Sequence, residues 1–186
     1  MLDTKTKLKI LDFDCETRPL SFRGDYRPTA EITALAMCWA DDQSSLRAYL
    51  LGDTDTVSLL KAFVKRYNEA DIVTAHNVRG FDLSIINAAL IEFGLPILTP
   101  KLAIDTYLDF KKRRDIPISQ EFLLDLFEIG KKEYMGQHAW REANRLTPKG
   151  LDKTYKRVTG DVLDHMALRL ELVRRNLLHP PKMWYP

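Results

Sequence analysis

Two carboxylates stand two residues apart at the end of an apolar run, in the segment LDFDCET from Leu11 to Thr17. Residues 8–15 are predicted to form a buried β-strand, because apolar residues dominate and neither glycine nor proline interrupts them. Since strand side chains alternate between two faces, Asp14 and Glu16 should project to the same side. Such a pair marks either a solvated strand end or a binding site for Mg²⁺ or Mn²⁺, which prefer oxygen ligands.

A further carboxylate opens a predicted helix. Residues 72–75 read as a short apolar strand that His76 and Asn77 end, and a helix follows over about residues 81–93. Asp82 therefore lies in the first turn of that helix. A favourable interaction with the helix dipole is the alternative explanation for an acid at this place. The neighbouring His76 and Asn77, together with the acidic strand upstream, favour a functional role.

A last carboxylate lies on a long helix near the end of the chain. From about Lys149 the sequence predicts a helix that is interrupted or begins afresh at Thr159 and Gly160. Asp161 abuts the predicted core-facing side, and Asp164 is the alternative acid. The apolar positions that recur at three- and four-residue steps are Tyr155, Val158, Val162, Met166, Leu170, Val173 and Leu177.

Taken together, these motifs resemble the DEDD family of 3′–5′ exonucleases, which includes the proofreading exonucleases of DNA polymerases and several ribonucleases. The resemblance rests on DxET in the first strand, HNxxxFD at the helix start and a late Asp in a GDV segment, and it spans roughly residues 8–177. It implies a ribonuclease-H-like fold and a metal-dependent nuclease. The implied catalytic and metal-binding residues are Asp14, Glu16, Asp82 and Asp161.

The resemblance also implies a metal-binding role for each of these acids. Two divalent ions, Mg²⁺ or Mn²⁺, about 3.5–4 Å apart would activate water and neutralise the leaving oxygen. Asp14 is expected to bridge both ions, with Glu16 and Asp161 helping to hold the water-activating one. Asp82 is expected to complete the shell of the second ion, largely through waters.

Several other residues enter through the same motifs. Thr17 completes DxET, which favours Asp14 and Glu16 over a competing pair of Asp12 and Asp14; Asp12, deeper in the apolar run, would need a hydrogen-bond partner or a raised pKa. An Asp-Thr pair at Asp105 resembles the family's short strand after the second motif. The expected substrate-binding residues are Thr17, His76, Asn77 and Asp105.

The segment around Asp161 corresponds to the third motif of the family and departs from it. That motif normally has a Tyr four residues before the final acid or a His five residues before it, and here those places hold Arg157 and Lys156. Arginine stays protonated, so it cannot take a proton from water. Tyr155, His138 and His165 are the alternatives for orienting the water, and the sequence does not choose among them.

Composition fits one enzyme domain. A chain of 186 residues can bury one good core, and 45% apolar with 29% charged residues is close to globular averages. We expect a single exonuclease-like domain over residues 1–186, with 178–186 as a C-terminal tail whose aromatic pair packs back beside a helix end or docks on a partner. The N-terminus does not read as a signal peptide, and Cys15 and Cys38 fall in predicted core strands, which favours buried thiols and a cytoplasmic location.

The order of elements predicts the fold class. Strands over residues 8–15, 31–40 and 46–51 are linked by short connections and should form an antiparallel meander. Alternating helices and strands then follow, which is typical of parallel additions. We therefore expect an α/β fold with a mixed five-stranded sheet flanked by helices.

Charge points to the expected partner. The net charge is only +2, but residues 131–175 contain 11 Lys or Arg against 6 Asp or Glu. A basic half can meet phosphates while an acidic half holds metal. We expect the 3′ end of DNA or RNA as substrate, a polymerase or another replication or repair protein as a further partner, and no membrane. The alternatives are a non-catalytic nucleic-acid-binding or accessory domain and, less favoured, a structure-specific endonuclease on the same fold.

Overall fold

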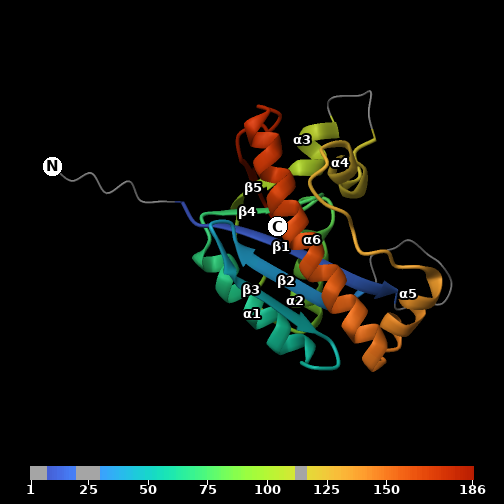
Figure 1. Cartoon of the computed structure of the whole chain (residues 1–186). Helices are drawn as coiled ribbons and strands as arrows, with labels where there is room; N and C mark the ends of the chain where they lie inside the picture. Colours follow the sequence, from blue (N-terminus) through green and yellow to red (C-terminus); the bar gives the residue numbers. More distant parts are fainter. Residues whose placement is uncertain (1–7, 20–29, 112–116) are drawn as a thin grey trace.

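A mixed β-sheet lies at the centre of the computed structural model, which describes residues 8–19, 30–111 and 117–186 (Figure 1). The six described strands are arranged in the order β3-β2-β1-β4-β5-β6. They are β1 (Ile10–Pro19), β2 (Ala30–Trp39), β3 (Asp42–Leu50), β4 (Ile72–Ala75), β5 (Lys101–Asp105) and β6 (Lys182–Trp184). The pairs β1–β2, β2–β3 and β5–β6 are antiparallel, whereas β1–β4 and β4–β5 are parallel. The predicted meander with parallel additions is confirmed.

Helices cover both faces of this sheet. They are α1 (Thr56–Glu69), α2 (Asp82–Glu92), α3 (Thr106–Lys111), α4 (Gln120–Leu126), α5 (Gln137–Asn144) and α6 (Pro148–Arg174). Helix α6 crosses one face over β1, β2 and β3, while α1 and α2 lie against the other (Figure 1). No helix in the described ranges is long and apolar enough to cross a bilayer.

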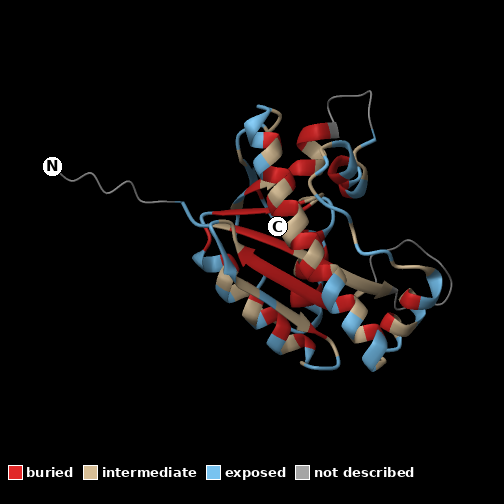
Figure 2. Cartoon of the chain, viewed as in Figure 1, coloured by how far each residue is buried: buried red, intermediate tan, exposed pale blue. Residues whose placement is uncertain are grey.

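The alternation of strand side chains divides the core in two. Leu11, Phe13 and Cys15 pack with α1 and α2, in a cluster that includes Leu60 and Ile86. On the other face, alanines of β2 pack against the apolar side of α6. Figure 2 shows buried positions in red along the strands and on parts of the helices. The even-numbered residues of β1 therefore point toward α6, as the period of two requires.

Over the described ranges the sheet has six strands, one more than the five predicted. Strand β6 pairs with β5 at the edge of the sheet, and Trp184 lies opposite Lys101 in this pairing. Trp184 is only 8% exposed and joins the core, whereas Tyr185 is 69% exposed. The expected tail thus packs back through one of its two aromatic residues. A three-residue strand is too short to show an alternating pattern, which is why the sequence did not reveal it.

The predicted break in the last helix is wrong. Helix α6 runs without interruption from Pro148 to Arg174. The Thr159 hydroxyl donates to the Tyr155 carbonyl at 2.6 Å, so the polar side chain is satisfied inside the helix. A Cβ added at Gly160 would meet no atom within 4 Å, so this glycine lies at an open position on the helix.

The predicted apolar stripe of α6 is only partly correct. Val158, Val162 and Met166 are buried as expected. However, Tyr155, Leu170 and Val173 are 50%, 59% and 57% exposed. Three further buried positions of α6 are polar, namely Asp161, His165 and Arg169. His165 and Arg169 are buried against Asp12 of β1, whereas Asp161 pairs with Lys132 and Arg157, as described below.

Candidate metal centre and nucleic-acid pocket

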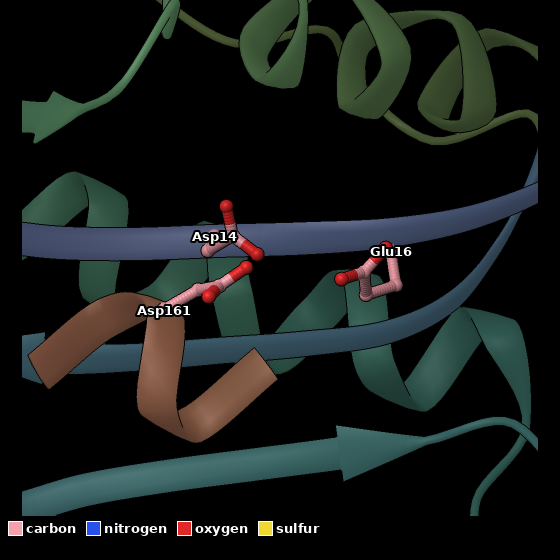
Figure 3. Close-up of side chains that lie close together, drawn as sticks. All are labelled: Asp14, Glu16 and Asp161. Atoms are coloured by element: carbon pink, nitrogen blue, oxygen red, sulfur yellow. The ribbon is translucent and has the colours of Figure 1, made fainter. Parts of the chain in front are cut away.

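Three carboxylates meet between strand β1 and helix α6. One oxygen each of Asp14, Glu16 and Asp161 lie within 4.8 Å of one another. Figure 3 shows the Asp161 carboxylate pointing from α6 toward Asp14 on β1. The two acids of β1 share a face because of strand alternation, and a register shift in the pairing with β2 follows directly, between Glu16 and Thr17. Three of the four acids that the motifs indicated are therefore brought together.

The charges of this acidic group, defined as Asp14, Glu16 and Asp161, oppose one another. Burial raises the pKa of Asp14 well above its usual value, and the charges of Asp82, Asp161 and Glu16 add to the effect. Burial, followed by the charge of Asp161, also raises the pKa of Glu16 to about 7, although Arg157 works against the shift. A positive charge placed among these oxygens would relieve the repulsion.

The oxygens of the acidic group suit a hard divalent cation. Asp161 is 3% exposed, and its Oδ1 has no hydrogen-bond partner among the described residues. A buried carboxylate oxygen without a partner is costly, so it calls for a ligand that the protein does not itself supply. Mg²⁺ and Mn²⁺ accept carboxylate oxygens from several side chains at once, and the residues present therefore fit such an ion.

Asp82 lies beside this group but is not a member of it. It is 2% exposed at the start of α2, where its Oδ1 accepts hydrogen bonds from the backbone nitrogen of Cys15 at 3.3 Å and from the Cys15 thiol at 3.4 Å. Burial raises the pKa of Asp82 to about 7. Because its charge also raises the pKa of Asp14, the two carboxylates act on each other.

Among the described residues, two basic side chains pair with the acidic group. Lys132 Nζ and Arg157 Nε each lie 2.9 Å from Asp161 Oδ2, and Arg157 Nε lies 3.5 Å from Glu16 Oε1. Arg157 also donates through Nη1 to the carbonyl of Glu133 at 2.6 Å. Arg157 was visible as a departure in the third motif. Lys132 was not, because it belongs to a connection without regular structure between α4 and α5 and no spacing links it to the acids.

An open pocket of about 400 Å³ lies against the acidic group. A volume of this size is within the range of small-molecule sites, which begins at about 300 Å³. It is lined by Asp14, His76, Asn77, Tyr107, Ser119, Gln120, Glu121, Lys132 and Arg157. Carboxylates, cations and an aromatic ring thus share one concave surface.

Two of the predicted substrate-binding residues, His76 and Asn77, line this pocket. Burial lowers the pKa of His76 to about 3, so its ring is neutral at pH 7. The ring nitrogens lie 3.0 Å from the Thr106 hydroxyl and 2.8 Å from the Ile118 carbonyl. His76 therefore offers an uncharged, fixed surface, edge-on to Tyr107 at 5.4 Å between ring centroids.

The other two predicted substrate-binding residues lie elsewhere. Asp105 is fully buried, and its carboxylate accepts hydrogen bonds from the backbone nitrogens of Asn77, Arg79 and Leu108. It thereby holds the connection that carries Asn77. Thr17 is half-buried on β1, immediately after Glu16. A substrate contact by Thr17 or Asp105 stays a prediction.

None of the three proposed water-orienting residues lines the pocket. His138 is exposed on α5, and Tyr155 is 50% exposed on α6. His165 is 2% exposed, and its Nδ1 donates to Asp12 at 2.8 Å. Their role in orienting water stays a prediction, and the third-motif side chain that does reach the acidic group is Arg157.

Asp12 has the hydrogen-bond partners that its burial requires. It is fully buried, and beside His165 it accepts hydrogen bonds from Arg169 Nε at 3.3 Å and Nη2 at 3.1 Å. Neither Asp12 nor Asp164 belongs to the three-carboxylate group. The geometry thus brings together Asp14, Glu16 and Asp161 and leaves out the two competing acids.

The chain resembles a solved polymerase structure. No family model and no curated protein matches the sequence. The family B DNA polymerase from the hyperthermophilic archaeon Pyrobaculum calidifontis superposes with a TM-score of 0.75 at 19% sequence identity. The match covers 92% of this chain and 25% of the polymerase, so the chain spans about a quarter of that protein's length. The fold is α/β and ribonuclease-H-like, as predicted.

Proposed function

We propose that the protein is a divalent-metal-dependent 3′–5′ exonuclease acting on DNA or RNA. One observation carries the proposal: three carboxylates from β1 and α6 lie within 4.8 Å of one another beside an open pocket. A buried oxygen of Asp161 that has no hydrogen-bond partner within the described part of the chain supports a metal ligand at this place. The motifs DxET and HNxxxFD add independent support from the sequence.

The proposed chemistry assigns each side chain a task. Bound Mg²⁺ or Mn²⁺ would supply a nucleophilic water and neutralise the leaving oxygen of a phosphodiester. Asp14, Glu16 and Asp161 would hold the metal, and Asp82 would act from the adjoining helix start. His76 and Asn77 line the pocket, where they would orient the terminal nucleotide.

The fold comparison supports nucleic acid as the partner. The solved neighbour is a DNA polymerase, and the family that the motifs resemble includes the proofreading exonucleases of such enzymes. We therefore propose the 3′ end of a nucleic acid as substrate and a polymerase or another replication or repair protein as a further partner. A cytoplasmic location belongs to the same proposal.

The decisive experiment is digestion of DNA and RNA labelled at the 5′ end, single- and double-stranded, with Mn²⁺ or with chelator. We expect stepwise shortening from the 3′ end that requires the metal. Asp161→Asn should abolish shortening, whereas Asp164→Asn, one helical turn away and outside the acidic group, should retain it. Cleavage at internal positions would indicate an endonuclease instead.

A second candidate function is a non-catalytic nucleic-acid-binding domain. The observation that favours it is Arg157, a permanent cation at the place where the family has a Tyr. Such a domain should bind end-labelled DNA or RNA in chelator without any shortening when Mn²⁺ is added. Retention of the complete acidic group favours the exonuclease, because unused neighbouring carboxylates destabilise a fold.

A further inference from the structure

Two cations of the chain stand where the acids need positive charge. Lys132 and Arg157 share one oxygen of Asp161, Oδ2, at 2.9 Å each. Both side chains are mostly buried, with 14% and 19% exposed, and they come from separate parts of the chain. The other Asp161 oxygen, Oδ1, is left without a hydrogen-bond partner among the described residues. The acidic group is therefore neutralised in part by the protein itself.

A divalent ion in the acidic group would compete with these cations for Asp161 and Glu16. An ion bound by Asp14, Glu16 and Asp161 would lie a few ångströms from both positive side chains, where like charges repel strongly. Both side chains line the pocket beside the acidic group, so the pocket gives them room to move. Lysine and arginine are also the side chains that proteins use to bind phosphate oxygens.

We propose that Lys132 and Arg157 are exchangeable counter-ions. They neutralise Asp161 and Glu16 before a metal binds, and they pair with a phosphate group of the substrate once the metal has displaced them. The inference rests on the proposed function and names the side chains that receive the substrate's phosphate. The Glu133 carbonyl holds Arg157 Nη1 and keeps that side chain at the pocket while its Nε contacts are exchanged.

The first test measures Mn²⁺ binding alone, by calorimetry, in the parent and three variants. Arg157→Met and Lys132→Met should each bind Mn²⁺ about tenfold more tightly, because a competing positive charge is gone. Both should also melt at a lower temperature in chelator, since the acids lose a counter-ion. Lys156→Met is the matched control: its ammonium group pairs with Asp152 at 2.8 Å on the surface, with 59% of the side chain exposed, and the variant should behave as the parent.

The second test measures phosphate binding without turnover. Deoxyadenosine and adenosine 5′-monophosphate carry a phosphate but no phosphodiester, so they serve as probes at saturating Mn²⁺. Arg157→Met and Lys132→Met should each bind them about tenfold more weakly, which is the usual scale for one lost charge-assisted hydrogen bond. Lys156→Met should keep the affinity of the parent. If Arg157→Met does not fold, Lys132→Met decides, because it leaves the contact between Arg157 and Glu133 in place.

The outcomes separate this inference from the proposed function. Unchanged or weaker Mn²⁺ binding in both variants, with the parent still binding Mn²⁺, overturns the exchange but leaves the exonuclease standing. Tighter Mn²⁺ binding with unchanged nucleotide binding also overturns the exchange, because the two cations then make no contact with the phosphate. If no protein binds Mn²⁺, both ideas fail. If only the variants bind it, the counter-ions are supported and the parent's metal dependence is lost.

Discussion

Glu16 and Asp82 have carboxyl pKa values near 7 in the folded protein, chiefly because both are buried. In the unfolded chain their pKa values return to about 4, so between the two values the folded state binds protons that the unfolded state releases. Their contribution to stability is therefore fully present below about pH 4 and is lost as the pH rises through 7. Without metal, the folded protein should therefore be more stable at acidic pH than at alkaline pH.

The variant Glu16→Gln should reveal this dependence of stability on pH. The parent should be more stable relative to the variant at pH 5 than at pH 8, because the amide cannot lose a proton. Since the pKa of Glu16 rises from 4.5 to about 7, the swing should approach about 3 kcal/mol. Urea unfolding at several pH values in chelator measures it, with Glu69→Gln, an exposed carboxyl at the end of α1, as control. A pH-independent difference would contradict the buried, repelling environment of Glu16.

Asp14→Asn should separate repulsion from metal binding. Without metal at pH 8 the variant should melt higher than the parent, because one buried charge facing Asp82 and Asp161 is removed. Mn²⁺ at about 100 times its dissociation constant should stabilise the parent by about 2.7 kcal/mol per site, and the variant by much less. Thermal melts with and without Mn²⁺ provide the measurement. An equal response of both proteins would place the metal elsewhere.

At the scale of elements, helix α6 shows where sequence reasoning works and where it stops. Asp161 could be placed on a helix beside buried residues, since Val158 and Val162 mark the apolar side. The continuity of the helix through Thr159 could not be foreseen, because it depends on a hydroxyl that bonds back to Tyr155. The burial of Arg169 likewise depends on Asp12, a residue distant in sequence.

Gly150 and Gly160 give a matched pair of tests for α6. A Cβ at Gly150 would lie 2.2 Å from the Glu142 carbonyl oxygen of α5, so Gly150→Ala must push the two helices apart. We expect a loss of about 1–3 kcal/mol in the free energy of unfolding. Gly160→Ala enters open space and should stabilise the helix by about 0.5–1 kcal/mol. Denaturant unfolding checks both, and equal effects would contradict the close packing of α5 on α6.

At the scale of the whole molecule, the sequence predicts the mixed sheet because three closely linked strands precede a clear alternation of helices and strands. Strand β6 escaped prediction because only three residues form it. Lys132 escaped for a different reason, since its contact with Asp161 joins residues distant in sequence and no periodic pattern encodes such a pair. Local patterns thus specify the acids and their elements, whereas the pairing of Lys132 and Arg157 with these acids emerges only from the folded chain.

Trp184→Ala tests how far the last strand contributes to the whole fold. Trp184 is 8% exposed and packs with the core beneath α1 and α2, so its truncation should cost about 3 kcal/mol. Tyr185→Ala, at a 69% exposed position, should change stability by less than about 0.5 kcal/mol. Urea unfolding measures both. Equal stability of the two variants would mean that β6 is not part of the cooperative unit.

The spacing of contact residues along α6 nearly matches the spacing along β1, and this match restricts insertions in α6. A helix rises about 1.5 Å per residue, so Asp161, His165 and Arg169 stand about 6 Å apart. Alternate residues of a strand are separated by about 6.6 Å, nearly the same step. His165 and Arg169 can therefore hold Asp12 while Asp161 meets Asp14. One residue inserted between Asp161 and His165 would turn the two halves of the helix by about 100° relative to each other. The segment between Asp161 and His165 therefore cannot gain or lose one residue without separating these two sets of contacts.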